Sequence, residues 1–215
     1  MKKIAIVGGG GHSKVIQDII RAGAEYEIVA LLDDKYPSPE KRGELIFAPV
    51  SYASQLKQAG EEVRFVIAIG DNRIRKQMAE RLASIDAQFA VLIHPSAVIS
   101  PSAVVEAGTV VMPYAVINAD TFVGRHAIIN TAAVIEHDNK IEDFAHISPN
   151  AALTGSVHVE EGVHIGAGAV VIPGKRIGAW SVVGAGAAVI NDIPEEVTAV
   201  GTPAKIIQYI HESLD

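Results

Sequence analysis

From Ile99 to Val183, an aliphatic residue occupies every sixth position of the chain without interruption. These positions are Ile99, Val105, Val111, Ile117, Val123, Ile129, Ile135, Ile141, Ile147, Leu153, Val159, Ile165, Val171, Ile177 and Val183. A six-residue period fits neither an α-helix nor an ordinary strand, whose side chains repeat at different intervals. It is typical of a parallel β-helix, in which each repeat unit forms one flat side of a coil and residues three units apart stack.

A second, smaller residue follows each aliphatic residue by four positions, and in most units it is Ala, Ser, Thr or Val. We expect the aliphatic side chain to fill the interior of the coil and the small residue to fit its tight corner. The corner position departs from this rule at Asn139 and Lys175. Positions that break a rule the chain otherwise obeys are candidates for function.

The chain before the repeat alternates short apolar runs with helix-like stretches, which predicts a parallel, doubly wound, Rossmann-like α/β sheet. The expected strands are Lys3–Val7, Glu27–Leu32, Arg64–Ile69 and Phe89–Ile93. The expected helices are His12–Arg21, Ser51–Ala59 and Arg73–Ala83. We therefore predict a domain over residues 1–94, a β-helix over 95–193 and a capping segment over 194–215, in which Lys205–Ser213 forms a short helix over the open end of the solenoid.

Composition limits the classes of function. The 215 residues include no cysteine, which excludes disulfides and thiolate metal sites, and the net charge of −7 argues against a nucleic-acid-binding surface. No apolar run approaches the length of roughly 18 residues that a membrane span needs. These features predict a soluble, cytoplasmic protein.

A glycine-rich loop, Gly8–Ser13, follows the first expected strand. Its backbone N–H groups could approach a phosphate at the start of the next helix, and Asp33-Asp34 could accept hydrogen bonds from a ribose or base. Ser13 stands where the G-x-G-x-x-G pattern has its third glycine, so a plain tight turn is the alternative. The domain is short for NAD, and a mononucleotide or nucleotide sugar suits its size better.

His137 is the candidate catalytic base. Stacking in successive coils places it beside Gly155, where the missing side chain leaves space and a backbone N–H could stabilise a developing oxyanion. Either Asp138 or Glu136 could orient the imidazole and raise its basicity. His146 and His164 also stack one coil apart and could bind a metal, as histidines do in γ-class carbonic anhydrases, although no third ligand is evident.

Several segments together resemble the hexapeptide-repeat acetyltransferases of the sialic-acid acetyltransferase type, and within them the UDP-4-amino-sugar N-acetyltransferases of bacillosamine-type pathways. In the repeat region these segments are Asn130-Thr131, Ile135–Asp138, His146, Pro173–Gly178 and Gly201–Lys205. In the N-terminal region they are Gly8–Ser13, Leu32–Asp34 and Ile67–Asn72. The resemblance implies a left-handed β-helix and a homotrimer with active sites between subunits.

The resemblance also implies the reaction, an acetyl transfer from acetyl-CoA to the amine of a UDP-linked 4-amino-dideoxy sugar, without a metal. It makes His137 the base and Asp138 the carboxylate that raises its basicity, with Glu136 beside them. The implied acetyl-CoA contacts are His146, Gly155, Ala167 and Ala185. The implied sugar-nucleotide contacts are Gly10, Gly11, His12, Asp33, Asp34 and Gly70. Sialic acid O-acetylation and a non-catalytic nucleotide-binding scaffold remain the alternatives.

Overall fold

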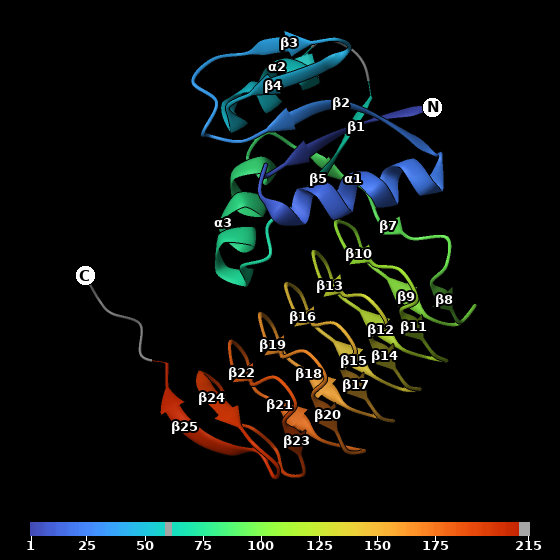
Figure 1. Ribbon diagram of the computed structural model, residues 1–215, viewed down its shortest axis with the longest axis vertical. Helices are drawn as coiled ribbons and strands as arrows, with labels where there is room; N and C mark the ends of the chain where they lie inside the picture. The colour runs from blue at the N-terminus through green and yellow to red at the C-terminus, as the bar shows by residue number, and fades with distance from the viewer. Residues whose placement is uncertain (59–61, 211–215) are drawn as a thin grey trace. The chain divides into compact units, whose positions relative to one another are not determined.

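The computed structural model describes residues 1–58 and 62–210. The chain falls into two compact units, Met1–Pro95 and Ser96–Asp215 (Figure 1). In the described ranges, no helix has both the length and the apolar character needed to cross a membrane.

The first unit is built on a sheet with strand order β3-β4-β2-β1-β5-β6. Its strands are β1 (Lys2–Val7), β2 (Tyr26–Leu32), β3 (Glu40–Arg42), β4 (Leu45–Ala48), β5 (Val63–Ile67) and β6 (Gln88–Phe89), followed by β7 (Leu92–Ile93). Its helices are α1 (Gly11–Gly23), the 3₁₀ turn η1 (Val50–Tyr52), α2 (Ala53–Gln58) and α3 (Asn72–Ala83). All neighbouring strands of the sheet run parallel except β3 and β4, which confirms the predicted parallel sheet.

Local sequence explains these elements and their ends. The central strand β1 is a continuous apolar run whose Ile4–Val7 segment is fully buried, as expected for a parallel strand covered on both faces. Helix α3 begins after Asp71, whose side chain accepts a hydrogen bond from the Ile74 N–H at 2.9 Å. Helix α1 begins after Gly10, which offers no such side-chain cap. The first N–H groups of α1 therefore receive no side-chain cap from Gly10.

The predicted boundaries need some corrections. The expected helix Ser51–Ala59 begins as η1 and continues as α2, and Ala59 lies outside the described residues. The expected strand Phe89–Ile93 is divided between β6 and β7. The antiparallel hairpin β3–β4 was not predicted, because β3 reads Glu-Lys-Arg and is exposed at every position, so it lacks an alternating apolar pattern.

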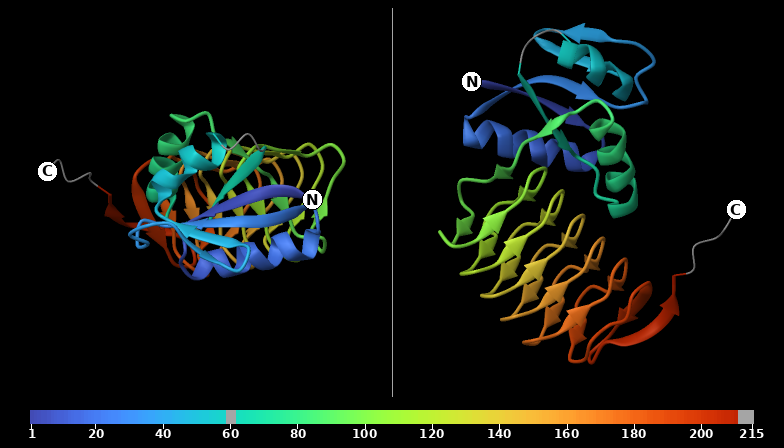
Figure 2. Two further views of the ribbon diagram at one scale, coloured as in Figure 1. Left: turned by 90° about the horizontal axis from the view of Figure 1, so that it is seen from above. Right: turned by 180° about the vertical axis from the view of Figure 1, so that it is seen from behind.

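The second unit is a parallel β-helix with three flat faces, visible as the stacked green-to-orange coils of Figures 1 and 2. Face 1 consists of β10 (Val110–Val111), β13 (Ile128–Ile129), β16 (His146–Ile147), β19 (His164–Ile165) and β22 (Val182–Val183). Face 2 consists of β8 (Val98–Ile99), β11 (Val116–Ile117), β14 (Val134–Ile135), β17 (Ala152–Leu153), β20 (Val170–Val171) and β23 (Ala188–Val189). Face 3 consists of β9 (Val104–Val105), β12 (Phe122–Val123), β15 (Lys140–Ile141), β18 (His158–Val159) and β21 (Arg176–Ile177).

The predicted repeat accounts for the core of this unit. The aliphatic positions from Val111 to Val183 are fully buried in one cluster, and the pattern continues to Val189, one unit beyond the predicted end. Ile99 and Val105, in the first coil, are only partly buried against the same cluster. The register also follows the prediction, since His146 pairs with His164 and Val134 with Ala152.

The predicted terminal helix Lys205–Ser213 is wrong. Residues Lys205–Tyr209 form strand β25, which runs antiparallel to β24 (Val197–Val200), and residues 211–213 lie outside the described part of the chain. Strand β24 extends face 1 and would otherwise leave its backbone groups unpaired at the sheet edge. Strand β25 supplies those hydrogen bonds. Pairing with the edge of β24 therefore determines the conformation of this segment, whose own helical pattern is short and weak.

Candidate active site

His137 lies in the turn between β14 on face 2 and β15 on face 3. Its Nδ1 atom is 2.7 Å from Asp138 Oδ2, and both side chains are more than half exposed. An ionised carboxylate only accepts hydrogen bonds, so Nδ1 carries the proton and Nε2 is left as the acceptor. The hydrogen bond to Asp138, together with the charges of Asp138 and Glu136, raises the pKa of His137 above its ordinary value.

Gly155 faces the His137 ring from the next coil. A Cβ atom built on Gly155 would lie 2.6 Å from His137 Cε1 and 2.8 Å from Nε2, far closer than carbon atoms pack. The backbones also meet, because the Ser156 N–H donates to the His137 carbonyl at 2.9 Å. The absence of a side chain at residue 155 therefore makes room for the imidazole itself.

Glu136 has a different partner. Its Oε2 atom accepts a hydrogen bond from Asn118 Nδ2 at 3.0 Å, one coil earlier. Asp138 therefore orients the imidazole, and Glu136 contributes a nearby negative charge that Asn118 holds in place. Sequence reasoning missed Asn118, although its register with Glu136 in the repeat could have revealed it.

Asn139 is the corner residue that follows this group. It is 2% exposed, and its Nδ2 atom donates to the Glu136, His137 and Thr154 carbonyls. The buried amide thus occupies a position that most coils give to a small residue.

The residues that the resemblance links to acetyl-CoA do not gather at one point of the chain. Gly155 lies with His137 at the corner between faces 2 and 3, whereas exposed Ala167 and Ala185 lie at the corner between faces 1 and 2. His146 projects from face 1. Within a single chain, face 2 therefore separates Gly155 and His137 from Ala167 and Ala185.

His146 and His164 stack as predicted, with ring centroids 4.7 Å apart and planes inclined by 8°. Asn130 Nδ2 lies 3.0 Å from His146 Nε2, and Ser148 Oγ lies 2.8 Å from His164 Nε2. In residues 1–58 and 62–210, no group of three or more His, Asp or Glu side chains is arranged to hold a metal ion. The two rings form a flat, partly buried surface with polar neighbours.

The first unit contains a cavity of about 460 Å³ at the carboxyl ends of its parallel strands. All of the predicted sugar-nucleotide residues line it: Gly10, Gly11, His12, Asp33, Asp34 and Gly70. Side chains added to Gly10 or Gly11 would meet no atom within 4 Å, so the loop backbone borders open space. The volume is typical of small-molecule sites, and the cavity opens at the start of helix α1.

The two aspartates at this cavity support its walls. Asp33 Oδ2 accepts from the Gly9 N–H at 2.6 Å, and the Lys35 ammonium donates to the Gly9 carbonyl at 2.6 Å. Asp34 accepts from the Val50 N–H and from Arg81, and the hydrogen bond from Arg81 is the main reason that the pKa of Asp34 is lowered. Each carboxylate therefore already holds a neighbouring loop in place.

His12 is neutral at physiological pH. Burial, reinforced by the nearby charge of Arg75, lowers its pKa to about 4. Its buried Nε2 atom has no hydrogen-bond partner in the described part of the chain, so this atom can serve a ligand. Arg75 is 1% exposed and donates to the Ile69 and Gly70 carbonyls, which ties down two acceptors at the cavity wall. Sequence reasoning did not identify Arg75.

Known proteins resemble both units. The family model of the PglD N-terminal domain matches residues 3–82. UDP-N-acetylbacillosamine N-acetyltransferase of Bacillus subtilis (strain 168) is 52% identical over 112 residues, which cover 52% of this chain and 52% of that protein. The matched region thus spans about half the length of that curated relative.

Solved structures match over nearly the full length. A variant of perosamine N-acetyltransferase from Caulobacter crescentus, in complex with CoA and GDP-perosamine, is 39% identical with a TM-score of 0.90, covering 97% of this chain and 98% of that chain. The acetyltransferase domain of PglB from Neisseria gonorrhoeae FA1090, in complex with acetyl coenzyme A, is 37% identical with a TM-score of 0.88, covering 96% and 99%. On this full-length similarity, the chain belongs to the family of sugar N-acetyltransferases in which a PglD-type N-terminal domain precedes a left-handed β-helix of hexapeptide repeats.

Proposed function

We propose that this protein transfers the acetyl group of acetyl-CoA to the amine of a UDP-linked 4-amino-dideoxy sugar, for glycan or polysaccharide synthesis. The observation that carries the proposal is the His137 imidazole, whose Nδ1 is held by Asp138 while Nε2 is left as an acceptor beside Gly155 of the next coil. UDP is the nucleotide named for the Bacillus subtilis relative, whereas the Caulobacter crescentus structure holds GDP-perosamine.

The chemistry follows from this geometry. His137 Nε2 accepts a proton from the sugar amine as the amine nitrogen attacks the thioester carbonyl carbon. The carbonyl oxygen becomes an oxyanion, for which the Gly155 N–H is the proposed donor, since it makes no other hydrogen bond in the described ranges. The carbon–sulfur bond then breaks, and the imidazolium returns the proton to the CoA thiolate. The products are the sugar amide and free CoA.

The cavity of the first unit is the proposed nucleotide-sugar site. The N–H groups at the start of α1, which receive no side-chain cap from Gly10, favour an anionic diphosphate, and the buried Arg75 guanidinium adds positive charge beside His12. Because His12 is neutral, its Nε2 atom can form a hydrogen bond with the ligand without bringing a charge into the cavity. Because both substrates are cytoplasmic metabolites, we propose that the protein acts in the cytoplasm.

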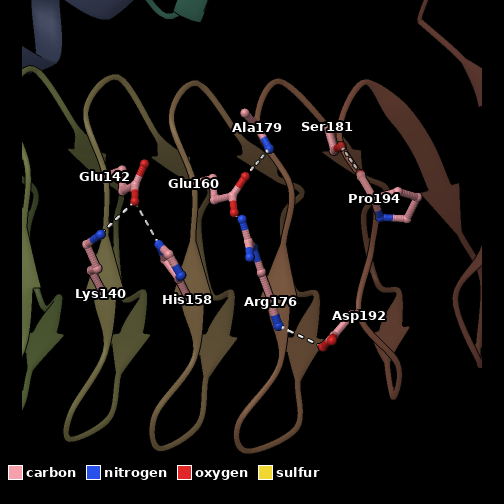
Figure 3. Close-up of polar contacts among 9 residues, drawn as sticks. All are labelled: Lys140, Glu142, His158, Glu160, Arg176, Ala179, Ser181, Asp192 and Pro194. Carbon is pink, nitrogen blue, oxygen red and sulfur yellow. Dashed lines mark hydrogen bonds and ion pairs between the residues drawn. The ribbon is translucent and has the colours of Figure 1, made fainter.

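A homotrimer with active sites between subunits is part of the proposal. Every outward position of face 2 is apolar: Val98, Val116, Val134, Ala152, Val170 and Ala188. Face 3, by contrast, has three polar outward positions beside apolar Val104 and Phe122: Lys140 and Arg176 form ion pairs with Glu142 and Glu160, and His158 forms a hydrogen bond with Glu142 (Figure 3). An apolar stripe along one face marks an interaction surface. A second copy packed there could bring its own face-1 residues to this chain's His137.

A substrate panel tests the proposal. Purified protein is mixed with acetyl-CoA and a UDP-4-amino sugar, a GDP-4-amino sugar or free sialic acid, and release of the CoA thiol is followed. We expect rapid release with the UDP-amino sugar. Release with sialic acid alone would instead indicate O-acetylation, and binding of UDP-sugar without thiol release would indicate a scaffold. Light scattering on the same sample tests the trimer, and a monomer that retains full activity would contradict the shared site.

A further inference from the structure

The corner residue Asn139 connects the parts of the candidate site. Its amide nitrogen lies 2.6 Å from the Glu136 carbonyl oxygen, 3.3 Å from that of His137 and 2.9 Å from that of Thr154. Because carbonyl oxygens surround this end of the amide, it must be the NH₂ end, since an amide oxygen there could donate to none of them.

These carbonyls belong to particular peptide groups. The Glu136 and His137 carbonyls lie in the peptide groups on either side of the His137 Cα atom, so the amide fixes the backbone from which the imidazole projects. The Thr154 carbonyl lies in the same peptide group as the Gly155 N–H. In a trans peptide the C=O and N–H point in opposite directions. Holding the Thr154 oxygen inside the corner therefore turns the Gly155 N–H outward.

Other polar corner residues donate to fewer carbonyl groups than Asn139 does. Thr109 donates to the Gly124 carbonyl, Thr121 to the Glu136 carbonyl, and Ser181 to the Pro194 carbonyl (Figure 3). Each of these hydroxyls braces one neighbouring coil. Asn139 braces its own turn as well, because its amide carries two donors, and it does so in the turn that carries His137.

We propose that Asn139 is a positioning residue for acetyl transfer, which aligns the general base His137 and the oxyanion donor of Gly155 through one buried amide. The inference rests on the proposed function. Its physical basis is that a base and an oxyanion donor on successive coils must keep their spacing during reaction. A hydrogen bond to the Thr154 oxygen also polarises the peptide group and strengthens its N–H as a donor.

Asn139→Ala is the direct test. Alanine occupies the same corner in many other units, so the coil can accept it. We expect kcat to fall by roughly 10- to 100-fold, a part of what loss of a base or an oxyanion donor costs. KM for acetyl-CoA and for the sugar nucleotide should stay within about twofold, because the amide touches neither ligand site directly.

Thr109→Ala is the matched control. Thr109 is another fully buried polar corner residue, whose hydroxyl donates to Gly124 O at 2.6 Å and accepts from the Ala127 N–H. Its loss should lower the melting temperature as much as Asn139→Ala does but leave kcat unchanged. If Thr109→Ala lowers kcat as strongly, the effect of Asn139 is one of general stability and the proposal is wrong.

Two further outcomes would overturn the proposal: kcat within twofold of the parent protein in Asn139→Ala, or a rise in KM alone. If that variant does not fold, Asn139→Ser decides by the same criteria, since Ser181 shows that serine fits a corner. His137→Ala is assayed alongside. Full activity of His137→Ala means that the proposed function itself fails, whereas an inactive His137→Ala with an active Asn139→Ala refutes only the role of Asn139.

Discussion

Gly155→Ala isolates the contact between His137 and the next coil. The position is one at which the turn accepts a side chain, because Ala119, Ala167, Ala179 and Ala185 occupy the equivalent place in other turns. The backbone of Gly155 does not have the positive φ that favours glycine. The alanine methyl should therefore disturb the neighbouring imidazole rather than the coil.

The size of the effect follows from the distances. The new Cβ would lie 2.6 Å from His137 Cε1, whereas carbon atoms pack at roughly 3.5–4.0 Å. The ring must retreat by about 1 Å, and its 61% exposure leaves it free to do so. A displacement of this size can cost about 100-fold in rate. Stability should change by less than about 0.5 kcal/mol, because the core residues Leu153 and Val157 are untouched.

Turnover and thermal unfolding are measured on the same preparation of Gly155→Ala. We expect kcat to fall by about two orders of magnitude while the melting temperature stays within a few degrees. Ala179→Val is the control, since it adds bulk at the same turn position at a different corner, away from His137. Unchanged turnover in Gly155→Ala would refute the placement of the reacting groups above this glycine. Equal loss of fold and activity would show that the backbone itself requires glycine.

Three further changes test the remaining parts of the site. His137→Ala should abolish acetyl transfer and leave the proposed trimer intact by light scattering, because the exposed ring fills no core space; appreciable turnover would remove it as the proposed base. Asp138→Asn should move the rising limb of kcat/KM towards lower pH, because the base acts when neutral and the carboxylate raises the pKa of His137; an unmoved limb would contradict this role. Gly10→Val should raise KM for the sugar nucleotide at least about tenfold and leave KM for acetyl-CoA unchanged, because the side chain would enter the open cavity; a normal KM would place the nucleotide elsewhere.

The sequence predicted the β-helix well because two independent constraints repeat in every unit. An inward aliphatic residue and a small corner residue leave almost no alternative for the fold or for the register of its coils. The ends of the chain's elements were predicted less well. Strand β3 is fully charged and exposed, and β25 forms because β24 leaves a free edge, which is a property of the assembled sheet.

The stacking of His137 on Gly155 was predicted from the repeat alone, because both residues occupy the same place in successive turns. The repeat alone did not predict which carboxylate orients the imidazole, because Asp138 and Glu136 both flank the histidine. It depends on Asn118, which holds the Glu136 carboxylate from the preceding coil. Arg75 was missed for a similar reason: its burial and its effect on His12 arise from the folding of α3 against the strand ends.

Asn139 shows what a break in a repeat can mean. From the sequence it was an exception to the corner rule, and so was Lys175, yet only Asn139 is buried. A half-buried lysine can reach solvent with its charged end, so the corner tolerates it without further contacts. A buried amide has to satisfy its donors, and in this turn the available acceptors are the carbonyls on either side of His137 and the one preceding Gly155. The requirement that these buried N–H donors be bonded therefore ties the corner of the coil to the geometry of His137, the proposed base.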